Sequence, residues 1–476
     1  MQTSTATHPN PPPRIAPERI EALAVGLRGQ VLQPHTPGYD EARSIWNAMI
    51  DRHPALIVQP RGAADVMAAV VFARDQGLEL AVKGGGHNVA GSAVCDGGLM
   101  LDLSAMTSVR VDPVARTARV EPGALLRDLD RETQAHGLAT PAGFISSTGV
   151  AGLTLGGGFG YLSRRFGLTA DNLRSVDLVT AGGKLVQAST DRNPDLFWGL
   201  RGGGNFGVAT AFEFDLHGFG PQVLAGPVVH TFEDAPDVLH RVAEIMCTAP
   251  DTVACLPVIR HAPPAPFIPE AYHGRLILLL ALIHTGDPTD SEAALAPLRV
   301  LGRPIADAVS TKPYTAFQSM FDASAVAGAR NYWKGHYLHA LSAGGIDVLC
   351  AHAARMTSKE SVIGMLSLGG AIARRPADAS PYPHRDAAWV LNIQSRWREA
   401  AEDAQHIAWA RGLFQAMAPF TTGGLYVNFI SGDEGEARVR AAYGETIHRR
   451  LATLKADWDP DNVFHLNQNI RPDVSV

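Results

Sequence analysis

The stretch of this chain that decides its fold is Val82-Lys-Gly-Gly-Gly-His-Asn-Val-Ala-Gly91. It places three consecutive glycines and a histidine directly after a short apolar segment. Glycine tolerates a positive φ, and without a side chain its backbone N–H can approach a phosphate group closely. Two more glycine clusters follow, over residues 149–160 and 201–207. Any one cluster is equally well explained as a tight turn, but three together favour a large ligand with a diphosphate.

The segments before this loop alternate between strand and helix patterns. Residues 18–27 have helical spacing, and residues 54–58 read as a short buried strand. The apolar positions of residues 63–76 predict an amphipathic helix that ends at Gly77. Residues 80–82 form the next strand and lead into the glycine loop. This order predicts an α/β arrangement, and further strands are expected over residues 99–103, 118–120, 178–180 and 209–214.

The chain is too long for one hydrophobic core, because single cores stop growing near about 250–300 residues. Proline-rich stretches become common after Gly220, whereas the last fifty residues return to dense motifs. We therefore expect a disordered tail over residues 1–17 and a first domain over residues 18–219. A second domain is expected over residues 220–424, with residues 425–476 closing back on the first.

Composition excludes several classes of protein. A formal charge of −6 provides no basic stripe for nucleic acid, and the four scattered cysteines indicate neither a disulfide framework nor a zinc knuckle. The longest apolar run, Leu276–Ile283, falls far short of the ~20 residues of a membrane helix. The N-terminus lacks the features of a secretory signal. We expect a soluble, cytoplasmic protein that binds neither nucleic acid nor a membrane.

Three motifs resemble known binding sites, but each lacks a feature that the site requires. Gly202, Gly204 and Gly207 match the nicotinamide-dinucleotide pattern, but no acidic residue follows at the required ~20 positions. Lys184 follows a glycine as a Walker lysine does, yet the first Walker glycine is missing. His336 and His339 lack the helical frame and the carboxylates of a metal site. No metal is expected.

His87 is the unusual residue of the first glycine loop. An imidazole at this position is not needed for packing and would face whatever the loop binds. It could donate a hydrogen bond to phosphate, act as a general base, or attack an electrophilic carbon of a cofactor. The residues alone leave these three roles open.

Motifs along nearly the whole chain resemble one family of flavoproteins. They cover residues 82–103, 141–160, 167–173, 195–208, 426–429 and 455–470, in the order found in that family. The chain is similar to the berberine-bridge-enzyme-like branch of the vanillyl-alcohol-oxidase superfamily, in particular to the bacterial 6-hydroxy-D-nicotine oxidase type. The set is specific because the motifs occur in a fixed order.

The resemblance implies an α+β fold. A PCMH-type FAD-binding domain would be assembled from the N-terminal part and the last segment of the chain, and the intervening substrate domain would hold a large antiparallel sheet covered by helices. By position in the motifs, the FAD-binding residues would be Lys83, Gly84, Gly85, Gly86, His87, Asn88, Gly91, Ser92, Ser146, Ser147, Thr148, Gly152, Gly156, Gly157, Gly158, Gly160, Val208, Asn428, Asn467 and Asn469.

The resemblance also assigns chemistry to single residues. His87 takes the place of the histidine that is bonded to the flavin 8α carbon. Many relatives have a second bond from a cysteine, but Ile145 stands there, so we expect one covalent link only. Thr148 falls at the position near flavin C4a that influences access of oxygen.

The proton acceptor is the open point of the resemblance. Many relatives use a tyrosine where this chain has Phe429, which leaves Tyr426 and Asn428 as the nearby polar groups. The strand pattern of residues 331–337 offers further candidates, because Tyr332, Lys334 and His336 would share one face and Trp333 and Tyr337 the other. Tyr426, Tyr332 and His336 are the catalytic candidates, with Thr148 for oxygen. An amine that enters neutral would need no strong base.

The activity implied is that of an FAD-dependent oxidase. The substrate would give a hydride to flavin N5, and O₂ would reoxidise the flavin to yield H₂O₂. Aromatic residues of the second domain favour a small hydrophobic or aromatic alcohol or amine: Phe317, Phe321, Tyr332, Trp333 and Tyr337. A flavin monooxygenase or an oxidative cyclase acting on a natural-product intermediate is the alternative, and a flavin carrier without activity is a third possibility. The protein would be a monomer or a homodimer.

Overall fold

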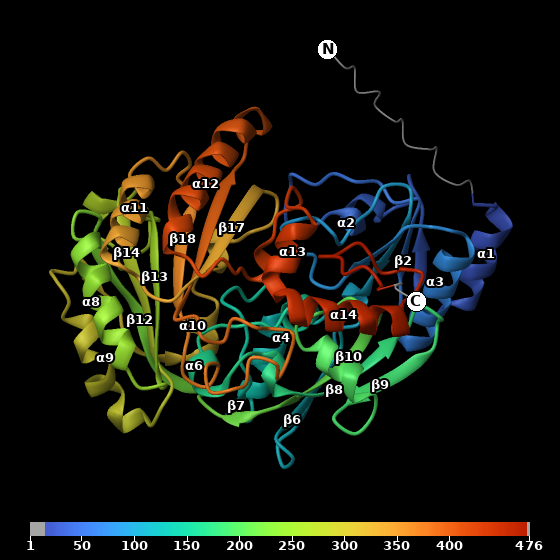
Figure 1. Cartoon of the computed structure of the whole chain (residues 1–476), viewed down its shortest axis with the longest axis horizontal. Helices are drawn as coiled ribbons and strands as arrows, with labels where there is room; N and C mark the ends of the chain where they lie inside the picture. The colour runs from blue at the N-terminus through green and yellow to red at the C-terminus, as the bar shows by residue number, and fades with distance from the viewer. Residues whose placement is uncertain (1–14, 474–476) are drawn as a thin grey trace.

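A computed structural model describes residues 15–473, which form two bodies side by side (Figure 1). The first body combines the start and the end of the chain with two small sheets, and the second is built on one large sheet. The predicted disordered tail falls outside the described residues except for residues 15–17. Of these, Pro17 already begins helix α1 (Pro17–Gly26).

The first sheet has the strand order β1-β2-β4-β3 and contains the predicted β-α-β unit. Its strands are β1 (Gln30–Leu32), β2 (Leu56–Gln59), β3 (Leu80–Lys83) and β4 (Leu99–Asp102). β4 pairs in parallel with both β2 and β3, and α3 (Ala63–Asp75) makes the crossover between them. The predicted end of this helix is confirmed, because Gly77 has a φ of +62°. Strand β3 then leads into the glycine loop.

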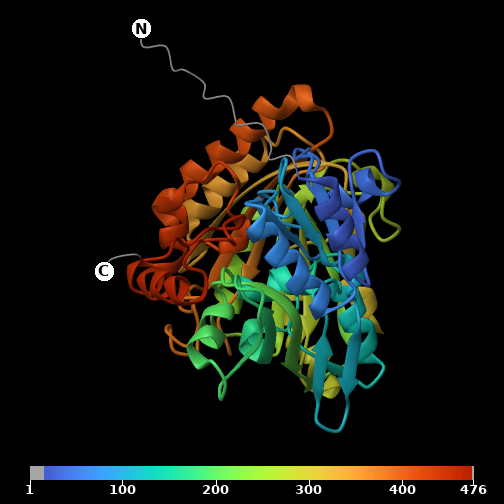
Figure 2. The same cartoon turned by 90° about the vertical axis from the view of Figure 1, so that its right-hand side faces the viewer.

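The second sheet of this body is antiparallel, with the order β5-β6-β10-β8-β9. Its strands are β5 (Val109–Asp112), β6 (Thr117–Val120), β8 (Leu173–Val179), β9 (Leu185–Ser189) and β10 (Val208–Asp215), and a separate two-stranded ribbon joins β7 (Leu138–Ala139) to β11 (His217–Gly218). The predicted strands over residues 118–120 and 209–214 fall within β6 and β10, and the one over residues 178–180 overlaps the end of β8, which stops at Val179. Figure 2 shows this sheet below the first one.

The second body contains an antiparallel sheet of eight strands, which confirms the predicted fold class. The order is β15-β12-β14-β13-β18-β19-β17, with β16 also paired to β12. The strands are β12 (Gln222–Thr231), β13 (Val253–His261), β14 (Leu276–His284), β15 (Ala306–Asp307), β16 (Ser310–Pro313), β17 (Arg330–Leu338), β18 (Val362–Ser367) and β19 (Trp389–Trp397). The apolar run that is too short for a membrane helix is the central strand β14, buried along almost its full length.

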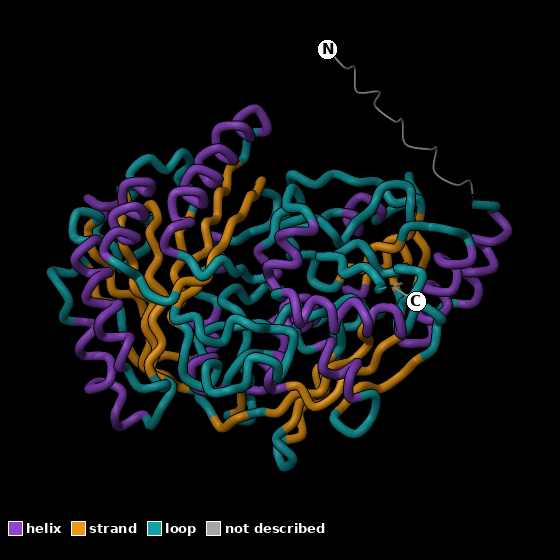
Figure 3. The backbone as a smooth tube through the Cα atoms, in the orientation of Figure 1, coloured by secondary structure: helices purple, strands orange, loops and turns teal. Residues whose placement is uncertain are grey.

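Helices cover the outer face of the large sheet (Figure 3). They are α8 (Ala235–Thr248), α9 (Ser291–Arg299), α11 (Ala343–Ala353) and α12 (Asp403–Met417). The opposite face of the sheet is therefore left for the first body. The remaining helices are α2 (Tyr39–Arg43), α4 (Leu126–Gln134), α5 (Val150–Leu155), α6 (Ser163–Phe166), α7 (Pro194–Leu200), α10 (Tyr314–Gln318), α13 (Glu436–Tyr443) and α14 (Glu445–Trp458). Within residues 15–473, no helix is both long and apolar enough to cross a membrane.

The last segment of the chain returns to the first body, where α14 packs near α7 (Figure 1). Lys455 of α14 is fully buried, and its ammonium group donates to the backbone oxygen of Asn205 at 2.6 Å, to Asp459 Oδ2 at 2.7 Å and to the Phe464 oxygen at 2.9 Å. Asn205 in turn donates to the Gln468 oxygen at 3.3 Å. The segment therefore contacts the third glycine cluster through buried polar groups.

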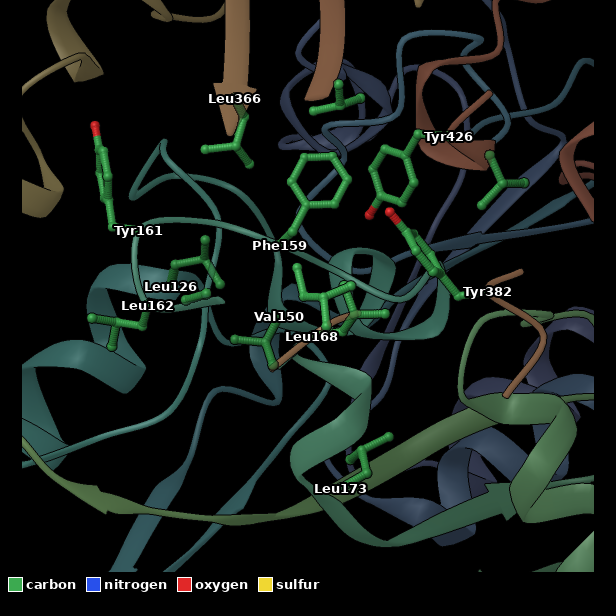
Figure 4. Close-up of a cluster of buried hydrophobic side chains, with 14 of the residues drawn as sticks. Leu126, Val150, Phe159, Tyr161, Leu162, Leu168, Leu173, Leu366, Tyr382 and Tyr426 are labelled. Carbon is green, nitrogen blue, oxygen red and sulfur yellow. The ribbon is translucent and has the colours of Figure 1, made fainter. Parts of the chain in front are cut away.

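One hydrophobic core extends through both bodies. Figure 4 shows Phe159 of the second glycine cluster beside Tyr426 of the last segment, with Leu366 of β18 close by. The rings of Phe159 and Tyr426 lie 4.5 Å apart between centroids. Three distant parts of the chain meet at this point, so the core fixes the large sheet against the glycine loops.

Candidate active site

A cavity of about 280 Å³ lies between the glycine loops and the free face of the large sheet. The first two glycine clusters and the segment around Tyr426 supply one side of it. Strands β13, β17, β18 and β19 supply the other side, which we call the floor. The cavity is lined by residues from Trp46 to Phe429, so it depends on segments from almost the whole chain.

The floor is built by alternate residues on adjacent antiparallel strands, since every second side chain of a strand points to the same face. One row across the sheet is Arg260, Val362, Gln394 and Trp333, each paired with the next. The neighbouring row is Val258, Gly364, Asn392 and Gly335. Gly364 lines the cavity and leaves its place in the floor without a side chain. Beyond it, Leu366 pairs with Val390 and makes that end of the floor apolar.

The glycine loops approach each other too closely to carry side chains. A Cβ atom at Gly85 would lie 2.5 Å from the backbone nitrogen of Gly149, and one at Gly149 would lie 2.5 Å from the nitrogen of Gly85. Gly86 also has a φ of +66°, which favours glycine. The cavity between these loops and the floor is therefore bordered by backbone atoms on the side of the loops. Such a surface is expected where a large ligand binds.

His87 is held at the edge of the cavity by an indole. Its imidazole stacks on Trp46 with 4.3 Å between ring centroids, and the Trp46 nitrogen donates to the Gly86 oxygen at 3.0 Å. The Nε2 atom of His87 is buried and has no hydrogen-bond partner within the described residues. Burial lowers the pKa of His87 to about 4, so the ring is neutral at pH 7 with a lone pair free to react.

The buried, unpartnered nitrogen and the bare glycine cradle fit the flavin that is expected from the sequence. Ile145 lines the cavity, and none of the four cysteines does. The side of the cavity opposite the floor thus offers one nucleophilic ring and no thiol. If FAD binds here, His87 is the residue placed to hold it.

The cavity brings together only part of the predicted cofactor set. The predicted residues that line it are Gly84, Gly85, Gly86, His87, Asn88, Thr148, Gly152 and Asn428. The predicted residues that do not line it are Lys83, Gly91, Ser92, Ser146, Ser147, Gly156, Gly157, Gly158, Gly160, Val208, Asn467 and Asn469. Asn467 and Asn469 each have a buried side-chain oxygen without a partner in the described part of the chain, and these oxygens are open to a ligand outside the cavity.

Two of the predicted residues that do not line the cavity form hydrogen bonds with other parts of the protein. The Lys83 ammonium donates to the Ala42 oxygen at 2.8 Å and lies 3.7 Å from Asp102. Ser146 donates its hydroxyl to Asp322 at 2.5 Å and its backbone nitrogen to the same carboxylate at 2.9 Å. Gly157 and Gly158 have positive φ values and shape the turn after α5. These residues support the loops from behind the cavity wall.

Tyr426 lines the cavity with a hydroxyl that accepts two hydrogen bonds. The donors are the Gly158 nitrogen at 3.1 Å and Asn428 Nδ2 at 2.9 Å. Burial raises the pKa of Tyr426 well above its ordinary value and outweighs these two donors, which lower it. The phenol therefore keeps its proton at neutral pH. Phe429 lies beside it, with 4.9 Å between the ring centroids, and also lines the cavity.

The prediction that Tyr332 and His336 face the cleft is wrong. Both side chains lie on the other face of β17, towards α12. His336 stacks on Phe414 and is bonded to the Phe414 oxygen at 3.0 Å, and the Tyr332 hydroxyl donates to Asp433 at 2.7 Å. The alternation was correct, but the cleft face carries Asn331 and Trp333 instead. Of the five aromatic residues named for the substrate, only Phe321 and Trp333 line the cavity.

Sequence reasoning missed the polar residues of the floor. Arg260 and Asn392 line the cavity together with Gln394. A signal was present in β13, where Leu256, Val258 and Arg260 alternate, so that a cation interrupts an apolar face. Glu360 and Arg396 also line the cavity and form an ion pair at 3.3 Å. Glu360 binds Arg398 as well, at 2.8 Å, and these hydrogen bonds lower the pKa of its carboxyl.

Comparison with known proteins gives two family matches. Residues 54–189 match the model of an FAD binding domain, and residues 425–471 match the model described as berberine and berberine like. (R)-6-Hydroxynicotine oxidase of Paenarthrobacter nicotinovorans is 31% identical over 95% of this chain and 99% of its own length. An FAD-linked oxidoreductase of Dictyostelium discoideum is 31% identical over 96% and 98% of the two chains.

Solved structures agree with these matches. The crystal structure of 6-hydroxy-D-nicotine oxidase from Arthrobacter nicotinovorans superimposes with a TM-score of 0.84 at 29% identity, covering 94% of this chain and 98% of that one. A chitooligosaccharide oxidase reaches the same TM-score at 23% identity, over 96% of this chain and all of the other. The second likeness concerns the fold alone.

Proposed function

The chain belongs to the berberine-like family of FAD-linked oxidoreductases, and from this premise we propose that it is an oxidase that holds FAD covalently through His87 alone. The FAD would take a hydride from the substrate and pass the electrons to O₂, giving H₂O₂. The substrate is a small, mainly hydrophobic amine or alcohol. The floor of the cavity would place the substrate, and the glycine loops would hold the cofactor.

One observation carries the proposal: the neutral, unpartnered imidazole nitrogen of His87 at the edge of a glycine-lined cavity. A nucleophile needs a free lone pair, and burial keeps this ring unprotonated. Trp46 holds the plane of the imidazole by stacking. Ile145 carries no nucleophile, so the second attachment found in many relatives has no counterpart.

The groups around the cavity favour an amine over an alcohol. A general base must be deprotonated near neutral pH in order to accept a proton from the substrate. The phenol of Tyr426 keeps its proton at that pH. Glu360 is ionised but accepts hydrogen bonds from Arg396 and Arg398, which lower the pKa of its carboxyl and weaken it as a base. Phe429 has no proton to exchange. An amine that enters in its neutral form loses only a hydride and needs no such group.

The covalent link is tested by denaturing the protein in acid and looking for flavin fluorescence on the polypeptide. We expect the wild type to keep its flavin, and His87→Ala to release all of it. His339→Ala, at an exposed histidine of the second body, is the matched control and should keep it. Flavin that stays attached in His87→Ala, or that washes out of the wild type, would show that the assignment is wrong.

The activity is tested by oxygen uptake with a panel of aromatic amines and alcohols. We expect H₂O₂ in equal amount to product, with the amines turned over faster. Oxygen incorporated into the product would instead identify the monooxygenase alternative. Failure of every substrate to bleach the flavin under anaerobic conditions would leave the protein as a flavin carrier.

A further inference from the structure

Arg260 is the one charged residue of the cavity lining that has no opposite charge beside it among the described residues. It ends the row of the floor that runs through Val362 and Gln394 to Trp333. Its Nε atom donates to the His261 oxygen at 3.3 Å. The two terminal nitrogens of its guanidinium have no hydrogen-bond partner within the described residues.

The other charges of the cavity lining are balanced. Arg396 is held by Glu360, by the Asn331 side chain at 3.4 Å and by the Val326 oxygen at 2.5 Å. Glu360 is bound by Arg396 and by Arg398, which lies outside the lining. Arg260 thus stays apart from this network, although it belongs to the same floor.

Arg260 is half-buried and lines the cavity, so that its guanidinium is open to a ligand there. Burial lowers the pKa of its guanidinium, and no carboxylate counteracts this effect. A cation that is partly shielded from water and has no carboxylate beside it is stabilised when an anion binds it. Arginine presents its donors as a planar fork that matches a carboxylate in two parallel hydrogen bonds. The geometry of the site therefore has a place for an anion that the protein itself does not supply.

We propose that the substrate carries a carboxylate, which Arg260 binds at the β13 end of the cavity floor. This inference rests on the proposed function and narrows its substrate class to extended acids with an apolar body, whose amine or hydroxyl lies at the end away from the carboxylate. The body of the molecule would lie over Gly364, where the floor has no side chain, and extend towards Trp333.

The arrangement also sets the length of the substrate. Arg260 and Trp333 lie three strand spacings apart, or about 14 Å between their Cα atoms. Because Trp46 contacts both Trp333 and His87, the cofactor end of the cavity lies at the β17 side. An acid with its carboxylate on Arg260 must therefore be extended for its reacting carbon to reach that side.

A second polar atom of the floor points to the same kind of ligand. The Oδ1 atom of Asn392 is buried and has no hydrogen-bond partner among residues 15–473, and its side chain lines the cavity. It is free to accept a hydrogen bond from a ligand group such as an amine or hydroxyl. Asn392 lies in the row next to Arg260 and closer to β17. A substrate with an acid at one end and an N–H or O–H further along satisfies both residues.

The test uses matched pairs of acids and amides as probes of the holoenzyme. Phenylacetate, 3-phenylpropanoate and 4-phenylbutanoate are titrated against their primary amides. Binding is followed by the flavin absorption spectrum and by the thermal unfolding midpoint, so that no turnover is required. The proteins are the wild type, Arg260→Gln, and Arg241→Gln as a control for charge, since Arg241 is exposed on α8.

We expect at least one carboxylate to bind the wild type about tenfold to a hundredfold more tightly than its amide, the range of a charge-assisted hydrogen bond. The preference should disappear in Arg260→Gln and persist in Arg241→Gln. An equal affinity for every acid and its amide, or a preference that survives in Arg260→Gln, would overturn the proposal.

The outcome is separable from that of the proposed function. A protein that prefers carboxylates but releases no H₂O₂ with any substrate would keep the role of Arg260 and lose the oxidase assignment. A protein that releases H₂O₂ from neutral amines and shows no preference for acids would keep the oxidase assignment and lose the role of Arg260. The FAD content of Arg260→Gln serves as a check, because it should equal that of the wild type if Arg260 binds substrate and not cofactor.

Discussion

At the scale of the residue, Lys83 and His87 belong to one motif but have different surroundings. His87 and Ile145 both line the cavity because their motifs fix a backbone path. Lys83 belongs to the same motif, yet its ammonium is used by Ala42 and Asp102. Those partners come from other segments of the chain, and no local pattern reveals them.

Asp130 offers a prediction at this scale. It lies in α4, is 2% exposed, and its Oδ2 atom has no hydrogen-bond partner within the described residues. Burial raises the pKa of its carboxyl to about 8, from an ordinary value of 3.8. The folded state thus keeps a proton that the unfolded state has lost between these two values. Stability therefore falls as the pH rises from about 4 to about 8, by up to about 1.4 kcal/mol per pH unit.

We expect Asp130→Asn to remove this slope, since the amide has the same shape and no charge. The free energy of unfolding is measured in urea at several pH values, and the variant should gain on the wild type as the pH rises. Glu132→Gln, on the exposed side of the same helix, controls for the loss of a carboxyl. Parallel pH profiles for Asp130→Asn and the wild type would refute the assignment.

At the scale of the element, alternation predicted which residues of β17 share a face but not which face meets the cleft. Both faces of the large sheet are covered, one by α12 and one by the glycine loops, so polarity does not distinguish them. The polar groups of Tyr332 and Lys334 can lie on the side of α12 because Asp433 and Arg411 form hydrogen bonds with them there. Partners that are 79 to 101 residues away along the chain therefore decide which face of β17 meets the cleft.

Gly364 provides the prediction at this scale. A Cβ atom added there meets nothing within 4 Å, and its φ is not in the left-handed region. Gly364→Leu should therefore fold normally and fill the middle of the floor. For the larger of any two substrates we expect KM to rise at least about tenfold, and for the smaller substrate we expect a smaller rise. The FAD content should not change.

The control is Gly412→Leu on α12, where an added Cβ also meets nothing within 4 Å and which does not line the cavity. Oxygen uptake at varied substrate concentration gives KM for both variants. If Gly364→Leu behaves like Gly412→Leu, the middle of the floor does not contact the substrate.

At the scale of the molecule, the motifs predicted a first domain made from both ends of the chain, and α14 of the last segment contacts α7. The interior polar network that holds the two ends together was not visible in the sequence. Lys455 fills its three donors with Asn205, Asp459 and Phe464. Asp459 accepts from the backbone nitrogens of Val463 and Phe464 at 2.8 and 2.9 Å. Only the folded chain brings Asn205 to this lysine.

Lys455→Met leaves the Asp459 carboxylate buried without its cation. We expect it to lower the free energy of unfolding by about 3–5 kcal/mol, measured in urea. The double variant Lys455→Met/Asp459→Leu should recover part of this loss, because the uncompensated charge is gone. Arg241→Gln, which breaks an exposed ion pair with Glu244, should lose no more than about 1 kcal/mol. Equal losses for the two single variants would contradict the role of the network.

The division of the cavity between distant segments has a consequence for the making of the protein. The loop with His87 leaves the ribosome early, whereas Tyr426, Asn428 and Phe429 leave it near the end of synthesis. A nascent or shortened chain carries the histidine without the rest of the cavity. If FAD is attached through His87 as proposed, the cavity around that histidine is complete only after Phe429 has been made, and a chain cut before Tyr426 should carry no attached flavin.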